Sequence, residues 1–481
     1  MTTGTWRRTM ACGGTSRFAV MLAAMAAGVA APIVGRCAAA GDRDRRDGGD
    51  MRGHVVATCE IPRVMLAAPS GEEPAVLLGG ISDLFVETDA DAGAPGNRRA
   101  WLVTDRGPNG TTEVEGRPHR TLAAPSYAPR ILEATIDWDA RQPSRLAVHL
   151  TGTVTLRDRA GENVTGRPNG LDNDPVIFDP QGRETIAPDV DGVDTEGLVR
   201  TRAGAFWLAE EYRPSLLAAT ADGTLQRRLV PAGAALAGAG VEVIDSLPAV
   251  YSQRRDNRGF EALAISPDEM RIFALMQSPL DGTDPAVARA LGNVRLVVVD
   301  PARGRPVGEY AYRLGDPEQK GYRQGKAAPD DGKLCAMAAL GPMSLLVLEQ
   351  ADGGVARLYR ADLAVATDTL SRTIAGDEPP AEMLRDLDEA DITPVAKTLL
   401  ADLAPILDDM RGGTANRGSG RRGVKKSGPL KLEGLAVADE QHIFLVNDDD
   451  FGIHEDADDD PPPRTCLWVV RLARPITLTQ R

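Results

Sequence analysis

Three glutamates of the sequence stand in the same short phrase, in which the glutamate is followed by a small residue and then an apolar one. They are Glu196, Glu261 and Glu433. Each phrase leads into a polar turn and a second apolar run that ends in polar residues. A weaker copy carries Asp83, and a fifth copy, at residues 333–337, has no acid. The recurrence predicts that these acids occupy equivalent positions of one repeated structural unit.

Acids at equivalent positions around one axis would face one another at the mouth of a central channel. Crowded carboxylates raise one another's pKa, and a divalent cation relieves the repulsion. Ligands that are all oxygen favour Ca²⁺, which accepts about 6–8 of them. The predicted metal ligands are Asp83, Glu196, Glu261, Glu433 and Asn447. The alternative is structural: the acids would accept hydrogen bonds from backbone N–H groups of the neighbouring unit and hold the ring together.

The ends of the second apolar runs add further polar residues to the same mouth. Arg106 and Arg258 are predicted to hold an anionic substrate through charge-assisted hydrogen bonds. Pairing of both arginines with the ring acids is an equal alternative. Glu211 or Asp448 would act as general base for a cation-bound water that attacks a phosphoester or a carboxyl ester.

A unit of strand, turn, strand and polar end is typical of a β-propeller, whose blades surround a channel. Aromatics are only 4% of the 481 residues, whereas Gly (50) and Pro (34) are frequent, which favours many short strands over a helical bundle. We expect an all-β fold of six blades, with seven as the alternative, because the uneven spacing of the copies suggests one or two blades without a legible motif. Residues 377–428 are predicted to be a partly helical, partly disordered insertion.

The first 40 residues have the features of an export signal, with a basic start, an Ala-rich apolar stretch and small residues at 38–40. The apolar stretch is too short to be a confident membrane span, so we expect no stable span after cleavage. Residues 41–54 are predicted to be a flexible linker and residues 55–481 the propeller domain. The protein is therefore expected to be exported, either to the periplasm or out of the cell.

Three cysteines follow the predicted signal, namely Cys59, Cys335 and Cys466. Cys59 and Cys466 stand near opposite ends of the domain, where a propeller ring would close. A bridge between them is one hypothesis, and two free buried thiols are the favoured alternative.

Charge and motif content argue against several other functions. The formal net charge of −14 opposes nonspecific binding to nucleic acid, which requires clusters of Lys and Arg. Five histidines without an H-E-x-x-H motif disfavour zinc. The sequence has no G-x-S-x-G elbow and no phosphate-binding or dinucleotide fingerprint after a strand. We expect a monomer that binds a small anionic ester.

The phrases resemble the phytase-like, "esterase-like activity of phytase" family of exported β-propellers. The motifs that carry the resemblance are residues 104–109 (TDRGPN), 194–198 (DTEGL), 206–211 (FWLAEE), 257–263 (NRGFEAL), 432–436 (LEGLA) and 447–452 (NDDDFG). The signature of the β-propeller phytases, two adjacent aspartates before Pro-Ala, has only a faint echo in Asn173-Asp174-Pro175-Val176. The resemblance therefore leaves phytate hydrolysis unsupported.

The resemblance and the repeated acids together predict a divalent-metal-assisted hydrolase of phosphoesters or related esters, with lactones as a variant. The alternative is a noncatalytic Ca²⁺-binding propeller that serves as a scaffold for a ligand or a protein. A panel of esters, assayed with and without Ca²⁺, separates the two.

Overall fold

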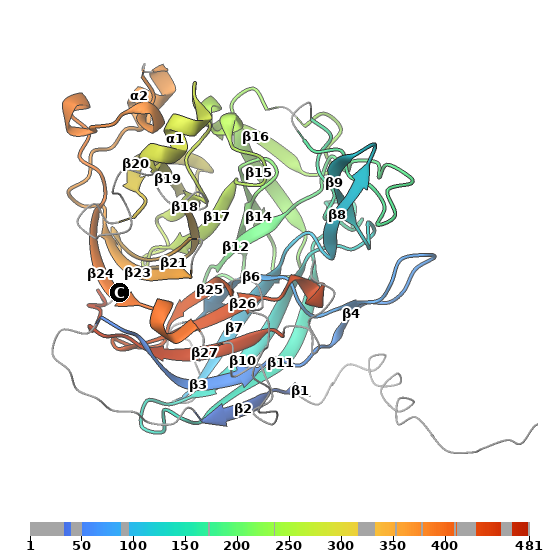
Figure 1. The fold of residues 1–481 in the computed structure, drawn as a ribbon, viewed down its shortest axis with the longest axis horizontal. Helices are drawn as coiled ribbons and strands as arrows, with labels where there is room; N and C mark the ends of the chain where they lie inside the picture. Colours follow the sequence, from blue (N-terminus) through green and yellow to red (C-terminus); the bar gives the residue numbers. More distant parts are fainter. Residues whose placement is uncertain are drawn as a thin grey trace, which may run out of the picture.

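Five β-sheets surround a central axis in the computed structural model (Figure 1). The structure describes residues 33–39, 51–87, 96–171, 174–234, 236–315, 332–351, 354–376, 379–407, 410, 430–453 and 464–479. The expected β-propeller is confirmed, but the expectation of six or seven blades is wrong, because there are five. Each of the five copies of the acidic phrase begins one blade, so the uneven spacing conceals long excursions and not further blades.

The five copies form the innermost strands of the blades. These strands are β6 (Ile81–Val86), β12 (Thr195–Arg200), β17 (Phe260–Ile265), β21 (Lys333–Gly341) and β25 (Lys431–Val437). Each inner strand contacts the next one in this order, and β25 contacts β6. The ring around the channel is therefore closed.

Each blade continues outward from its inner strand, mostly through antiparallel pairing. The first blade adds β7 (Asn97–Thr104), β10 (Arg130–Trp138), β11 (Leu146–Thr155) and β1 (Ile33–Val34), and the second adds β13 (Phe206–Glu210), β14 (Ser215–Ala219), β15 (Leu225–Pro231) and β16 (Glu242–Leu247). The third adds β18 (Ile272–Met276), β19 (Asn293–Asp300) and β20 (Arg305–Arg313), and the fourth adds β22 (Ser344–Ala351), β23 (Val355–Asp362) and β24 (Ala396–Asp402). The fifth adds β26 (His442–Asp448), β27 (Cys466–Arg471), β3 (His54–Glu60) and β2 (Arg36–Ala39).

The fifth blade is built from both ends of the chain, and Figure 1 shows the blue strand β3 beside the red strand β27. Their register places Leu467 opposite Cys59. Cys59 is disulfide-bonded, whereas Cys335 and Cys466 are free and buried. The hypothesis of a Cys59–Cys466 bridge is therefore wrong, and so is the favoured alternative of two free thiols, because only Cys466 of this pair is free. The ring closes there through backbone hydrogen bonds.

The second strands of the blades are continuous apolar runs in the sequence because neighbouring blades bury both of their faces. All five residues of β13 are buried, and so are all five of β18. Apolar side chains of neighbouring blades pack together between the sheets, as in the cluster that joins Trp207, Phe273 and Val297. This burial makes the sheets rigid supports for the residues at their ends.

Excursions between strands account for the uneven spacing. A hairpin of β8 (Asn109–Val114) and β9 (Arg117–Leu122) leaves the first blade after β7, and a second hairpin pairs β4 (Met65–Ala67) with β5 (Val76–Leu77). The third blade carries α1 (Pro285–Leu291), whose first turn is capped by the Asp284 side chain, bonded to the amides of Ala286 and Val287. The fourth blade carries α2 (Leu370–Ala375) between β23 and β24.

The prediction of a partly helical insertion at residues 377–428 agrees with the structure only in part. Short 3₁₀ turns occur at η2 (Ala381–Met383), η3 (Asp388–Ala390) and η4 (Ala404–Ile406). Residues 396–402, which show helical spacing of apolar residues, instead form β24, the outer strand of the fourth blade. Pairing with β23 overrides the local pattern there. Residues 411–429 lie outside the described residues.

The N-terminal predictions remain predictions. Residues 33–39, within the predicted signal, form β1 and β2, which pair with β11 and β3. Residues 1–32 and 40–50, which include most of the predicted signal and linker, lie outside the described residues. None of the helices among the described residues is long and apolar enough to cross a membrane.

Candidate metal centre at the acidic mouth of the channel

The three glutamates of the repeated phrase occupy β-bulges of the inner strands. In every inner strand the register with the second strand skips one residue near the start, and the skipped residues are Ser82, Glu196, Glu261, Cys335 and Glu433. A bulge re-aims its side chain. The three glutamates of the repeated phrase are therefore structurally equivalent, and all of them lie at the end of the channel where the inner strands begin.

Electrostatic coupling shows that these acids share one space. Burial raises the pKa of Glu196 well above its usual value, and the charges of Asp194, Glu261, Glu211 and Glu433 raise it further. Burial also raises the pKa of Glu261, with added repulsion from Glu211 and Glu433 and partial relief from Lys333. The structure therefore brings together three of the acids predicted as metal ligands, from blades two, three and five.

Asp83, another predicted ligand, has a different place. It follows the bulge residue Ser82, so it is equivalent to Gly197 and Gly434 and not to the glutamates. Its carboxylate accepts hydrogen bonds from the amides of Leu84 and Leu198, each at 2.7 Å. Asp83 therefore has the structural role that was the alternative to metal binding: it accepts backbone hydrogen bonds and joins the inner strands of neighbouring blades.

The Asp83 side chain is deep in the channel. Burial raises its pKa to about 8, against the amide hydrogen bonds of Leu198, Leu84 and Leu435. Beyond it, at the end where the inner strands leave the ring, is a cavity of about 320 Å³ to which all five inner strands contribute. Asp83 therefore contributes to the lining of this cavity.

Replacing Asp83 by Ala should lower the free energy of unfolding by about 3 kcal/mol or more, because buried amides of two blades lose their acceptor. Asp83→Asn keeps one acceptor oxygen and should lose less. Chemical denaturation of both variants, with Asp137→Ala in the half-buried outer part of β10 as the control, measures the difference. Equal stability of Asp83→Ala and wild type would show that the inner strands do not depend on this carboxylate.

The tightest group of acids at the mouth is Asp194, Glu196 and Glu211. One carboxylate oxygen of each lies within 4.8 Å of the others. The three residues are 0%, 9% and 1% exposed. Burial and the charge of Asp194 raise the pKa of Glu211 to about 7, although Arg106, Arg258 and Arg120 lower it. Among the described residues this is the group of three with the spacing that a metal ion needs.

A second ring is formed by residues at equivalent positions in the last part of the second strands or directly after them. Its members are Asp105, Glu211, Gln277, Gln350 and Asp448. Burial raises the pKa of Asp448 well above its usual value, and Asp450, Glu433 and Asp105 add to this against the opposing charge of Lys431. Lys431 Nζ lies 3.4 Å from Asp448, and Lys333 Nζ lies 3.6 Å from Glu433.

The donor set of the mouth fits a hard divalent cation. Eight carboxylates interact there with five cations; the acids are Asp105, Asp194, Glu196, Glu211, Glu261, Glu433, Asp448 and Asp450, and the cations are Arg106, Arg120, Arg258, Lys333 and Lys431. The negative charge is thus in excess, and the Oε2 atom of Glu261 is buried without a hydrogen-bond partner. Oxygen ligands in excess of local positive charge are what Ca²⁺ prefers.

The remaining predicted site residues have mixed positions. Arg106 lies at the mouth, where its Nη1 is 2.5 Å from Asp194. Arg258 donates a hydrogen bond to Gln277. Asn447 points elsewhere: its carboxamide donates to the carbonyl oxygens of Asp448 and Arg464 and accepts from the amide of Cys466. Asn447 therefore fastens β26 to the segment before β27 and is not a ligand in this arrangement.

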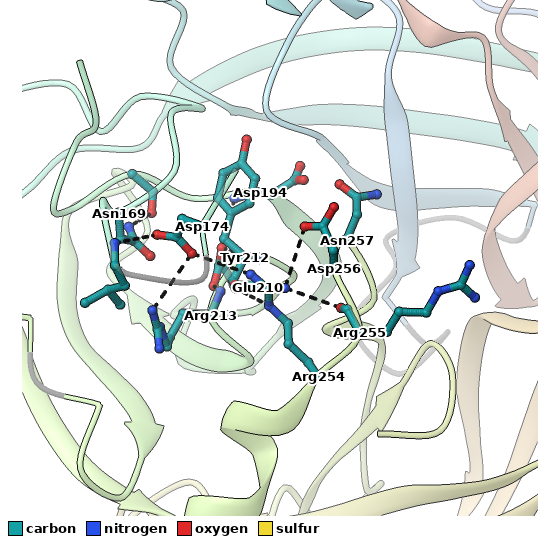
Figure 2. A network of polar contacts seen from close by, with 12 residues as sticks. Asn169, Asp174, Asp194, Glu210, Tyr212, Arg213, Arg254, Arg255, Asp256 and Asn257 are labelled. Carbon is teal, nitrogen blue, oxygen red and sulfur yellow. Dashed lines mark hydrogen bonds and ion pairs between the residues drawn. The ribbon is translucent and has the colours of Figure 1, made fainter. Parts of the chain in front are cut away.

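Beside the mouth is a network of arginines and acids to which Asp174 and Glu210 belong (Figure 2). Asp174, which belongs to the faint phytase echo, has Oδ1 3.5 Å from Arg254 and 3.9 Å from Arg213. Glu210, which precedes Glu211, forms an ion pair at 2.9 Å with the fully buried Arg228. Asp174 and Glu210 therefore pair with arginines beside the mouth and are not members of the carboxylate cluster.

Several residues of the mouth were not predicted as members of the site. Asp194 stands two residues before Glu196. The only sequence feature that could have identified it as a site residue is its place at the start of the same phrase. Lys333 and Lys431 occupy the position equivalent to Asp194 in blades four and five, which the alignment of the phrases could have revealed. Arg120 and Asn257 come from excursions between strands, and no repeat points to them.

Comparison with known proteins agrees with this architecture. The profile of the family described as "Phytase-like: Esterase-like activity of phytase" matches residues 77–451. A protein of Arthroderma benhamiae described as "Uncharacterized secreted protein" is 26% identical over 241 residues, which is 44% of this chain and 46% of that protein. The chain thus spans about half the length of this curated relative.

Solved structures with similar folds have low scores. A luciferin-regenerating enzyme is 9% identical, with a TM-score of 0.31 over 83% of this chain and 100% of the other. The PQQ-bound aldose sugar dehydrogenase of Streptomyces coelicolor is 12% identical, with a TM-score of 0.28 over 88% of this chain and 99% of the other.

Proposed function

Because the chain belongs to the phytase-like, "esterase-like activity of phytase" family, we propose that it is a hydrolase of small anionic esters that uses a divalent cation bound at the acidic mouth. Phosphoesters are the first class of substrate, with carboxyl esters and lactones as further candidates. The proposed cation is Ca²⁺.

One observation carries the proposal, namely the three carboxylates of Asp194, Glu196 and Glu211 held within 4.8 Å of one another in a nearly closed space. Carboxylates so placed repel one another, and their positions are fixed by bulges and strand ends that burial makes rigid. Such preorganised charge is costly without a function and is suited to binding a cation. Glu261 and Glu433, across the ring, supply further oxygens.

Five residues of the mouth divide three tasks in the proposed reaction. Asp194, Glu196 and Glu211 hold the cation, and Arg106 orients the anionic group of the ester through its guanidinium. Asp448, whose pKa is raised by burial, is the proposed general base, which takes up the proton that moves during hydrolysis and later returns it. When bound, a divalent cation supplies Lewis-acid polarisation of the ester oxygen.

We propose further that the chain is exported, as the description of its relative as a secreted protein suggests. An extracellular or periplasmic setting supplies millimolar Ca²⁺, which a site of modest affinity requires. We expect the protein to act as a monomer and not to bind nucleic acid, since its net charge is −14.

The experiment that tests this function is a panel of p-nitrophenyl phosphate, p-nitrophenyl acetate and simple lactones. We expect turnover with Ca²⁺, loss of turnover after EDTA treatment and recovery when Ca²⁺ is returned. The Glu211→Gln variant should fold and show no turnover. A protein that binds Ca²⁺ but turns over no ester would instead be the noncatalytic scaffold.

A further inference from the structure

Two arginines at the edge of the acidic mouth meet on a single neutral oxygen. The Oδ1 atom of Asn257 accepts a hydrogen bond from Nη1 of Arg106 at 2.6 Å and another from Nη1 of Arg120 at 2.8 Å. Arg106 lies between β7 and β8, and Arg120 lies in β9, whereas Asn257 precedes β17 of the third blade. Residues of the first and third blades therefore converge on one carboxamide.

The charges of these arginines are unequally neutralised. Arg106 forms an ion pair at 2.5 Å with Asp194, which is fully buried. Arg120 has an ion pair at 3.4 Å with Asp256, whose side chain is 57% exposed, so solvent screens most of this attraction. A carboxamide oxygen carries no net charge and so neutralises neither guanidinium, and Arg120, whose acid partner is largely in solvent, can still pair with a further anion.

The position of Asn257 is fixed by its backbone. It has a φ of 53°, a left-handed conformation that Asn adopts more readily than most residues. Two residues later, a Cβ on Gly259 would lie 2.2 Å from the carbonyl oxygen of Glu211, so the chain must pass close to the carboxylate cluster. Figure 2 shows Asn257 beside Asp194 at one edge of the polar network, and Arg106 Nη1 contacts both residues.

We propose that Asn257 is a positioning residue that holds Arg106 and Arg120 as a two-guanidinium clamp for an oxyanion of the substrate. The clamp adjoins the three carboxylates of the proposed cation site through Arg106 and Asp194. Guanidiniums present forked donors that match phosphate and carboxylate oxygens. The expected substrates are then esters that carry a doubly charged group or a second anionic group. Arg120, and not Arg258, is the arginine that holds the anion together with Arg106. The inferred substrate class rests on the proposed hydrolase function. The binding of an anion by the two arginines does not depend on that function.

The test uses inorganic sulfate, a tetrahedral dianion that stays soluble with Ca²⁺, and isothermal titration calorimetry of the full chain. The variants are Asn257→Gly, which tolerates the positive φ but removes the oxygen, and Arg120→Gln. Losing one charge-assisted anchor should weaken sulfate binding about tenfold or more in each variant. Arg120→Lys, which keeps the charge but not the fork, should recover part of the loss. The matched control is Glu115→Gly, another non-glycine residue at positive φ, in the turn between β8 and β9.

The outcomes separate the clamp from the proposed hydrolase. Tenfold weaker sulfate binding in Asn257→Gly and Arg120→Gln, with Ca²⁺ affinity and sulfate binding of Glu115→Gly at wild-type values, supports the clamp. Unchanged sulfate affinity in Asn257→Gly, or no sulfate binding by wild type, overturns it whatever the ester panel gives. Wild type that binds sulfate at the clamp but hydrolyses nothing overturns the hydrolase and leaves the clamp in place.

Discussion

Replacing Glu196 by Gln is expected to lower Ca²⁺ affinity about a hundredfold or more, and Ca²⁺-dependent ester hydrolysis with it, while the propeller stays folded. Gln keeps the shape of the side chain but removes one negative charge from a group of three carboxylates. Ca²⁺ affinity depends steeply on the number of charged ligands. Removal of a repelling charge should leave the stability of the cation-free protein unchanged or raise it, since Asp194, Glu211 and Glu261 all repel Glu196.

The measurement is Ca²⁺ titration by calorimetry, with thermal unfolding followed in EDTA for the same samples. Glu113→Gln, an exposed glutamate in β8, is the matched control and should behave as wild type. A variant that no longer folds would not be informative, so the thermal unfolding midpoint in EDTA is measured first. Wild-type Ca²⁺ affinity in folded Glu196→Gln would remove this residue from the site.

The second large effect is a loss of stability with rising pH in the absence of a divalent cation. The pKa of Glu211 in the folded state is about 7, above its usual 4.5. Between these values the folded protein keeps a proton that the unfolded chain has released, so the free energy of unfolding falls as pH rises through this window. For Glu211 alone the shift corresponds to about 3 kcal/mol. The raised pKa values of Glu196, Glu261 and Asp448 act in the same direction.

Ca²⁺ should reverse much of this decline, because a bound cation favours the ionised carboxylates. In EDTA we expect a lower unfolding midpoint at pH 8 than at pH 5, and with saturating Ca²⁺ we expect the largest rise at pH 8. A ligand at a hundred times its dissociation constant adds about 2.7 kcal/mol. Carboxyls with lowered pKa values, such as Asp139 at about 2, act mainly below this window. A midpoint in EDTA that rises from pH 5 to pH 8 would contradict the electrostatics of the mouth.

The repeated phrase contained enough information for the fold and for the meeting of Glu196, Glu261 and Glu433. Equivalent positions of a propeller face its axis, so a repeated acid implies a ring of acids. The number of blades did not follow in the same way. Spacing alone cannot distinguish a missing blade from an excursion, and here the β8–β9 hairpin, α1 and the segment around α2 are excursions.

The misplacement of Asp83 has a simple physical cause. A one-residue shift in a strand reverses the side chain's direction, and the bulge in each inner strand makes the register depend on which residue is skipped. Alignment on the apolar residues Leu84, Leu198 and Leu435 places Ser82, not Asp83, with the glutamates. Arg120 and Asn257 could not be predicted, because their meeting depends on the path of a hairpin and of a connection between blades.

The most direct test of the proposed cation site is the anomalous diffraction of a crystal grown or soaked with Ca²⁺. We predict one strong anomalous peak among the carboxylates of Asp194, Glu196 and Glu211, with ligand distances of about 2.3–2.6 Å. A fully Ca²⁺-exchanged crystal with no peak at this mouth, or with the ion bound only elsewhere, would contradict a cation site formed by these three residues.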